Sequence, residues 1–141
     1  MTASSRTLHH LGEWKVELRG DTIKELFAEL ARLLGEATGS VRASSVARAW
    51  EHVELDAPDQ VTLLVDWANE LIGRSEVGGC AYGDVRNLTV ESGPTSAARL
   101  VADVRGAHVD EWVSPLKAAT YHGATLERQG SEWRAVVLFD V

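Results

Sequence analysis

The sequence contains little cysteine, no long apolar run and no excess of positive charge. Among its 141 residues Cys80 is the one cysteine, which excludes an internal disulfide and a zinc site of four thiolates. No apolar segment approaches the roughly 20 residues that cross a bilayer, so we expect no membrane partner. The 14 basic residues are outnumbered by 21 acidic ones, and the net charge of −7 argues against direct nucleic-acid binding.

The length and the N-terminal segment set the expected organisation and location. A chain of 141 residues and 15.3 kDa fits one domain, so we predict a single domain over residues 1–141. Met1–Arg6 lacks the apolar stretch of a secretory signal peptide, and we therefore expect a cytoplasmic location.

The first half of the chain begins with the pattern of a strand followed by a helix. In Trp14–Arg19 apolar and charged residues alternate, which predicts a strand with its charged side chains, Glu17 included, in water. Thr22 and Glu25 then have the spacing of a helix-capping box. Apolar residues recur after them at intervals of three and four, as expected for an amphipathic helix, and Gly35 and Gly39 are candidate helix ends.

A second strand and helix follow at an offset of 37 residues. The strand is predicted at about Val46–Leu55, and the helix opens at Pro58 and Asp59 and ends at Gly73. At the same offset, the matching positions are Thr22 with Asp59, Leu26 with Leu63, Phe27 with Leu64, Leu30 with Trp67 and Leu34 with Leu71. This pattern favours either two related units side by side or two unrelated units of the same general type.

The second half of the chain is mostly strand by its pattern. A flexible connector is predicted at Gly78–Gly83. Predicted strands follow at 85–91, 98–105, 116–122, 124–128 and 132–140, the last two joined as a hairpin. The expected fold class is α+β, a two-layer arrangement of helices on a sheet with mostly antiparallel C-terminal strands.

Motifs of common enzymes are absent from the sequence. It has no phosphate-binding loop and no Gly-x-Ser-x-Gly elbow, and Cys80 has no evident base beside it. The histidines lack the spacing of a helical zinc motif and fit surface or core positions better than ligand positions. They are His9, His10, His52, His108 and His122.

Two features near the C-terminus carry charge in apolar surroundings. Asp140 follows the apolar run Val136–Phe139, and Val141 after it bears the terminal carboxylate. Such neighbouring carboxylates favour either a raised pKa or a bound cation, for which calcium, magnesium or manganese is suited. The alternative is a frayed terminus with both groups in water. Lys117 is the one charge in its stretch, where it either pairs with a carboxylate or phosphate or occupies an exposed strand position.

Several segments together resemble the archease family. The stretch Lys117–Gly123, Lys-Ala-Ala-Thr-Tyr-His-Gly, is similar to the Lys-Ala-Val-Thr-Tyr-His stretch of that family. Asp56–Asp59 and Leu63–Leu71 resemble its Ala-Pro-Asp motif and its Leu-Leu-Val-Asp-Trp-x-Asn-Glu-Leu helix. Leu138–Val141 resembles its terminal apolar-Asp-apolar signature, so the resemblance covers most of the chain.

The resemblance implies two intertwined strand–helix units and an accessory function. Archeases assist the RtcB-type RNA ligase of tRNA splicing and RNA repair by promoting guanylate transfer from GTP to the ligase and its repeated turnover. The chain is therefore expected to be an activator rather than an enzyme. By the same resemblance, Lys117 and Asp140 act in ligase activation, and Asp140 and the Val141 carboxylate are metal ligands.

One metal ligand of the family differs in this chain. Archeases begin with His-Thr-Ala-Asp before the first strand, whereas this chain has His10-Leu11-Gly12-Glu13. Glu13 keeps the charge and the oxygen donors of the aspartate but lengthens the side chain by one methylene. Because calcium accepts irregular oxygen cages better than magnesium does, calcium is the first expectation, with magnesium or manganese as alternatives.

Two other functions use the same residues. The carboxylates with His10 or His122 could hold a metal-activated water, which would make the chain a hydrolase. Alternatively, the change at Glu13 marks a diverged relative that binds no metal and has another partner. Phosphate release by the isolated protein favours the first alternative, and the lack of any heat on calcium addition favours the second.

Overall fold

The computed structural model describes residues 3–10, 13–41, 48–92, 97–112 and 117–140. Their elements are β1 (Ser4–His10), β2 (Glu13–Gly20), α1 (Ile23–Thr38), β3 (Gly39–Val41), β4 (Glu51–Ala57), α2 (Gln60–Gly78), β5 (Cys80–Ser92), β6 (Ala98–Trp112), β7 (Ala118–Gln129) and β8 (Glu132–Asp140). Two short strands, β1 and β3, were not expected, because β1 has few apolar residues and β3 follows the helix directly in a segment rich in glycine and serine.

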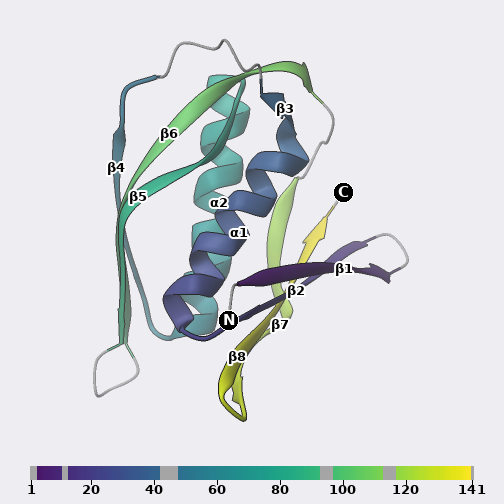
Figure 1. Cartoon of the computed structure of the whole chain (residues 1–141), viewed down its shortest axis with the longest axis vertical. Coiled ribbons are helices and arrows are strands. Elements are labelled where there is room, and N and C mark those ends of the chain that lie inside the picture. Colours follow the sequence, from purple (N-terminus) through teal and green to yellow (C-terminus); the bar gives the residue numbers. More distant parts are fainter. Residues whose placement is uncertain (1–2, 11–12, 42–47, 93–96, 113–116, 141) are drawn as a thin grey trace.

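The described strands form two antiparallel sheets that share a pair of helices. One sheet has the order β1-β2-β8-β7, and the other has β3-β6-β4 with β5 also paired to β6. Helix α1 packs on β5 and β2, and helix α2 packs on β7, β5 and β4. In Figure 1 the helices stand between β4, β5 and β6 on one side and β7 and β8 on the other. The α+β class with helices packed on antiparallel sheets is confirmed.

Helix α1 begins as the sequence predicts but continues past its first candidate end. The Thr22 hydroxyl accepts a hydrogen bond from the Glu25 N–H at 3.2 Å, which satisfies one free amide of the first turn. The helix passes Gly35 and ends before Gly39. A Cβ on Gly35 would lie 2.6 Å from the Gly83 Cα, so Gly35 permits a close approach to β5 instead of ending the helix.

Helix α2 also extends beyond its predicted end. Asp59 caps its start by accepting a hydrogen bond from the Thr62 N–H at 2.7 Å. Gly73 lies inside the helix, and the end comes at Gly79, whose φ of 64° is left-handed. The prediction of a flexible connector at Gly78–Gly83 is wrong, because β5 begins within that segment and its first residues are buried.

The two strand–helix units match at the predicted offset in their caps and core positions. Thr22 and Asp59 both cap helices, and the paired leucine and aromatic positions of α1 and α2 are all buried. The Trp67 indole N–H donates to the Phe27 carbonyl at 2.9 Å and links the two helices. The strands of the two units are not neighbours, because β2 and β4 belong to different sheets. The helices of the two units pack against each other.

Candidate functional site

Glu13, Lys117 and Asp140 meet at one end of the sheet β1-β2-β8-β7. Glu13 begins β2 and is the cross-strand partner of Asp140, which ends β8. On the other side of β8, Ala118 is opposite Asp140, and the Lys117 N–H donates to the Asp140 carbonyl at 3.1 Å. Three of the four predicted site residues are therefore neighbours, and the fourth, Val141, lies outside the described residues.

The side chains of Glu13 and Asp140 project from the same face of the sheet. Direct cross-strand partners share a face and have Cβ atoms about 4.5–5.5 Å apart. The next pair along, Trp14 and Phe139, faces the core, where the two rings lie 5.3 Å apart. Glu13 and Asp140 consequently point away from the helices, and Asp140 is exposed. Two carboxylates opposed in this way repel each other, which a cation between them would offset.

These donors fit a hard divalent cation in kind, but the described residues supply only part of a coordination shell. Carboxylate oxygens suit calcium, magnesium and manganese, and calcium takes six to eight oxygens. In the described part of the chain no group of three or more His, Cys, Asp or Glu residues could hold a metal ion. The third predicted ligand, the Val141 carboxylate, lies outside the described residues.

The longer side chain of Glu13 is accommodated without a break in the backbone pairing. Strands β2 and β8 stay in one register from the Glu13–Asp140 pair to the Gly20–Trp133 pair. The extra methylene lets the Glu13 carboxylate reach farther from the backbone than an aspartate at the same position would. A cation bound at this end of the sheet would be coordinated by this longer side chain instead of an aspartate.

Helix α2 holds the segment that follows Lys117. The Asn69 side-chain amide donates to the Ala119 carbonyl at 3.1 Å, and its oxygen accepts from the Ala119 N–H at 2.8 Å. Two residues further on, the Tyr121 hydroxyl donates to the Asp66 carboxylate, and this hydrogen bond raises the pKa of Tyr121. Neither Asp66 nor Asn69 was given a role from the sequence, although their spacing of three places both on one helix face.

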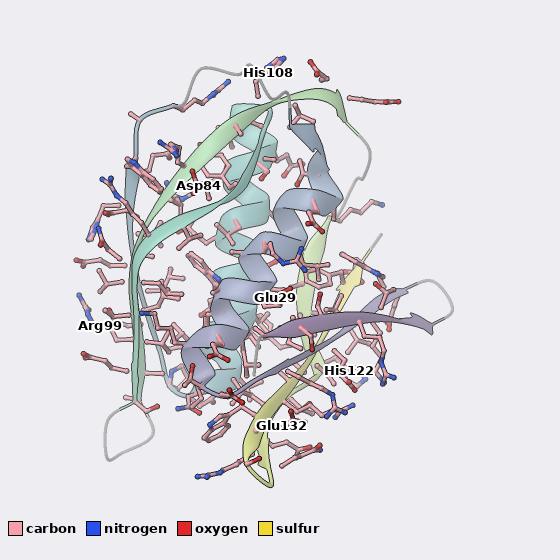
Figure 2. The ribbon with its side chains drawn as sticks, viewed as in Figure 1. Glu29, Asp84, Arg99, His108, His122 and Glu132 are labelled. Atoms are coloured by element: carbon pink, nitrogen blue, oxygen red, sulfur yellow. The ribbon has the colours of Figure 1, made fainter. Side chains whose placement is uncertain are left out.

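The described histidines are scattered. In Figure 2 the exposed His122 of β7 lies far from His108, which is near the opposite end of the molecule. His52 of β4 lies between Glu54 at 3.0 Å and Asp103 at 3.2 Å, and these hydrogen bonds raise the pKa of His52. Only the backbone of His10 is placed near the carboxylates, as the cross-strand partner of Glu13 in β1. The hydrolase alternative thus gains no ligand cluster from the described residues.

The predicted position of Cys80 among flexible glycines is also wrong. Cys80 begins β5 and is fully buried. A Cβ on Gly106 would lie 2.4 Å from its sulfur, so the thiol is enclosed by neighbouring backbone. A nucleophile needs access and an activating group, and burial removes the first.

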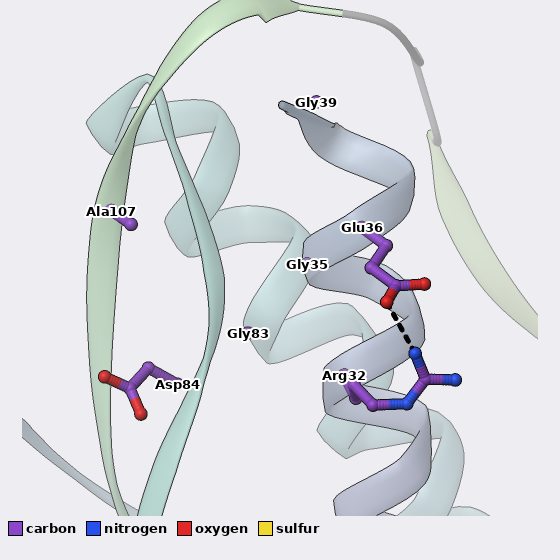
Figure 3. A pocket seen from close by; sticks show the side chains of 7 residues that line it. All are labelled: Arg32, Gly35, Glu36, Gly39, Gly83, Asp84 and Ala107. Atoms are coloured by element: carbon purple, nitrogen blue, oxygen red, sulfur yellow. Dashed lines mark hydrogen bonds and ion pairs between the residues drawn. The ribbon is translucent and has the colours of Figure 1, made fainter. Parts of the chain in front are cut away.

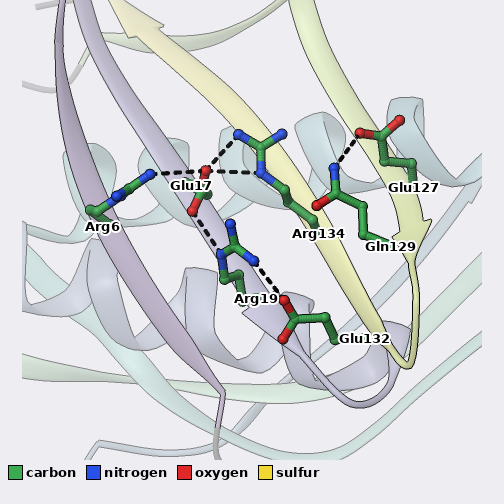
Figure 4. Close-up of polar contacts among 7 residues, drawn as sticks. All are labelled: Arg6, Glu17, Arg19, Glu127, Gln129, Glu132 and Arg134. Atoms are coloured by element: carbon green, nitrogen blue, oxygen red, sulfur yellow. Dashed lines mark hydrogen bonds and ion pairs between the residues drawn. The ribbon is translucent and has the colours of Figure 1, made fainter.

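A second carboxylate on the same face of β2 has a different environment. Glu17 was predicted to face water but is only 3% exposed. Arg19 Nε at 2.8 Å, Arg134 Nε at 2.9 Å and Arg6 Nη2 at 3.3 Å donate to its oxygens from three adjacent strands (Figure 4). Burial by itself raises the pKa of a carboxyl, but the guanidiniums of Arg19 and Arg134 outweigh it and hold the pKa of Glu17 at about 2.

A pocket of about 690 Å³ lies between α1 and the strands β5 and β6 (Figure 3). It is lined by Arg32, Gly35, Glu36, Gly39, Gly83, Asp84 and Ala107. Arg32 and Glu36 form an ion pair at 2.6 Å along one wall. The pocket shares no residue with the Glu13, Lys117 and Asp140 group, so the candidate site is a feature of the sheet end and not of this cavity.

Comparison with known proteins gives a family and relatives. The model of the Archease protein family (MTH1598/TM1083) matches residues 6–141. The protein named archease from Methanopyrus kandleri is 30% identical over 140 residues, covering 95% of this chain and 96% of that protein. The protein of the same name from Methanosarcina barkeri is 28% identical over 140 residues, covering 95% and 93%.

Two solved structures have the same fold. The solution structure of Methanobacterium thermoautotrophicum protein 1598 has a TM-score of 0.77 at 18% identity, covering 97% of this chain and 98% of that one. The crystal structure of an archease from Thermotoga maritima, described as a possible chaperone, has a TM-score of 0.61 at 22% identity and covers 96% of each chain. Neither of the two described helices is long and apolar enough to cross a membrane.

Proposed function

The chain belongs to the archease family, and from this premise we propose that it is an accessory protein that activates an RtcB-type RNA ligase. It promotes transfer of guanylate from GTP to the ligase and supports repeated turnover in tRNA splicing or RNA repair. The chemistry stays on the ligase, so the chain is an activator and not an enzyme. The observation that carries this proposal is the meeting of Glu13, Lys117 and Asp140 at one end of a sheet.

In this proposal the carboxylates hold a divalent cation. Glu13, Asp140 and the Val141 carboxylate are the ligands, with calcium as the first choice and magnesium or manganese as alternatives. The bound cation supplies positive charge that polarises and orients phosphate oxygens. The pairing of Glu13 directly opposite Asp140 supports this role, because two opposed carboxylates on one face favour a cation between them.

In this proposal Lys117 supplies a second positive charge at the same end of the sheet. It is exposed, and the hydrogen bond from its N–H to the Asp140 carbonyl fixes where its side chain leaves the backbone. A lysine ammonium is a compact charge with three donors, suited to a phosphate or carboxylate of the ligase complex. The net charge of −7 favours encounter with a basic ligase that handles RNA. The description of the Thermotoga maritima relative as a possible chaperone agrees with assistance to another protein.

Lys117→Ala and Asp140→Asn test the proposal in a mixture of the chain, the ligase, GTP and metal. Each variant should fold like the parent, because both side chains are exposed, and should lower the rate of ligase guanylylation by about tenfold or more. Lys24→Ala is the matched control, since Lys24 is an exposed lysine on α1 away from this end of the sheet. If both site variants stimulate the ligase like the parent, the assigned roles are wrong.

Two measurements on the isolated chain separate the alternatives. Release of phosphate from GTP without ligase would indicate a metal-dependent hydrolase and contradict the accessory role. Calorimetric titration with calcium should give heat for the parent and less for Asp140→Asn. No heat with calcium, magnesium or manganese would indicate a diverged protein without the metal, and the role of the cation would then be abandoned.

A further inference from the structure

One side chain covers the outer edge of β7 next to Lys117. The N–H and C=O of Ala119 both bond to the Asn69 amide, at 2.8 and 3.1 Å. Strand β7 is the last strand of its sheet, and an edge strand leaves backbone groups unpaired unless another group covers them. Asn69 of α2 therefore takes the place of a neighbouring strand at Ala119.

The same short segment is fixed on its other edge by β8. Ala119 is 5% exposed and lies opposite Phe139, while the Lys117 N–H donates to the Asp140 carbonyl at 3.1 Å. The three residues from Lys117 to Ala119 are thus held between a helix side chain on one edge and the end of β8 on the other. The hydrogen bonds from Asn69 therefore hold the same segment, Lys117 to Ala119, whose first residue bonds to Asp140.

We propose that Asn69 is a positioning residue for Lys117, an inference that rests on the proposed function. Its side-chain hydrogen bonds go to the backbone of Ala119, through which it would act on Lys117. An asparagine amide presents one donor and one acceptor side by side, which the N–H and C=O of one residue require. An aspartate at position 69 keeps the acceptor for the Ala119 N–H but places a second acceptor against the Ala119 carbonyl. An alanine at position 69 removes both hydrogen bonds.

Hydrogen exchange tests the positioning without the ligase. In Asn69→Ala the amides of Lys117 and Ala119 should exchange at least about tenfold faster, because the segment loses two hydrogen bonds on its outer edge. The Val137 amide in the middle of β8 should be unchanged. Gln60→Ala is the matched control, since Gln60 is an amide on the same helix that bonds Ser92 of β5. Unchanged exchange at Lys117 in Asn69→Ala overturns the proposal.

Asn69→Asp provides a second variant if the alanine variant does not fold. Its side chain has nearly the same shape and still accepts from the Ala119 N–H, so the fold should be kept. The exchange of Lys117 should again be faster than in the parent, by a smaller factor than in Asn69→Ala. Exchange equal to the parent in this variant also overturns the proposal.

A double-variant experiment with the ligase distinguishes positioning from general support of the fold. Asn69→Ala alone should lower maximal stimulation of guanylylation by about tenfold. In the Lys117→Ala background it should cause no further loss, because the group that it positions is already absent. Independent, multiplying losses would show a structural role only and overturn the proposal. If Lys117→Ala itself leaves stimulation unchanged, the proposed function fails at Lys117, and the exchange data still decide whether Asn69 places this segment.

Discussion

The outer face of β2 carries two glutamates four positions apart, and their environments differ. Glu17 is covered by three guanidiniums from β1, β2 and β8 and is almost completely buried. Glu13 stands at the strand end opposite the exposed Asp140, a second carboxylate. One strand thus combines a carboxylate covered by three arginines with a carboxylate that lies opposite another carboxylate across the sheet.

We expect this difference to separate the stability of the fold from the proposed cation binding on one surface of the sheet. A buried carboxylate with several charged hydrogen bonds is costly to disturb, because its partners are left without their counter-charge. Asp140 at the end of β8 is exposed, so we expect its carboxylate to contribute little to folding. The four predictions that follow test this contrast, beginning with the largest expected effect.

Removing the Glu17 carboxylate should have the largest effect on folding. Glu17→Ala leaves Arg19 and Arg134 without their shared acceptor and should lower the free energy of unfolding by about 3–5 kcal/mol. Urea unfolding at neutral pH measures this loss. Arg6→Ala is the control, because Arg6 is 64% exposed and its removal should cost no more than about 1 kcal/mol. If Glu17→Ala were as stable as Arg6→Ala, Glu17 would not be the stabilising carboxylate of this surface.

Acid should weaken the fold through the same carboxyl group. The pKa of Glu17 is about 2 in the folded chain against an ordinary value of 4.5. Because the folded pKa is the lower one, ionised Glu17 stabilises the fold above pH 4.5, and this stabilisation is lost as the pH falls through the folded pKa. The shift corresponds to about 3 kcal/mol. Urea titrations between pH 5 and 2 should show a flatter pH dependence in Glu17→Gln, and equal slopes would refute the assignment.

Calcium should stabilise the parent chain through the opposed carboxylates. At a concentration one hundred times the dissociation constant, the gain in unfolding free energy should be about 2.7 kcal/mol. Asp140→Asn should show little or no such gain, while its stability without calcium should lie within about 0.5 kcal/mol of the parent. Thermal unfolding with and without calcium gives both numbers. A large loss of stability in calcium-free Asp140→Asn would show that this end of β8 supports the fold.

Shortening Glu13 should have the smallest effect. Glu13→Asp keeps the charge and restores the side-chain length of the family aspartate, so calcium affinity should rise by about fivefold, or about 1 kcal/mol. Calorimetric titration of the parent and the variant makes the comparison. Weaker calcium binding by Glu13→Asp would mean that the longer side chain is the fitted one in this chain.

The sequence predicted local patterns well and long-range contacts poorly. The alternation in Trp14–Arg19 correctly placed Val16 and Leu18 in the core, because burial on one face leaves a period of two. It could not predict the burial of Glu17, since two of the covering arginines come from other strands. Gly73 was taken as a helix end because glycine signals both a stop and a tolerated interior position.

The candidate site was predictable in its residue types and not in its geometry. Asp140 and Lys117 were found from their apolar surroundings and from the family resemblance. That Glu13 lies opposite Asp140 depends on strand register, which pairs residues from the two ends of the described chain. Asn69 had no role from the sequence, because a side chain that bonds the backbone of a distant strand leaves no periodic signal.

The occupied edge at Ala119 also restricts how another polypeptide can extend this sheet. An added strand recognises an edge through free backbone N–H and C=O groups. At Ala119 both groups are already engaged by Asn69, so an incoming extended segment would have to displace that side chain first. Asn69 therefore opposes the addition of a strand by β-augmentation alongside Ala119.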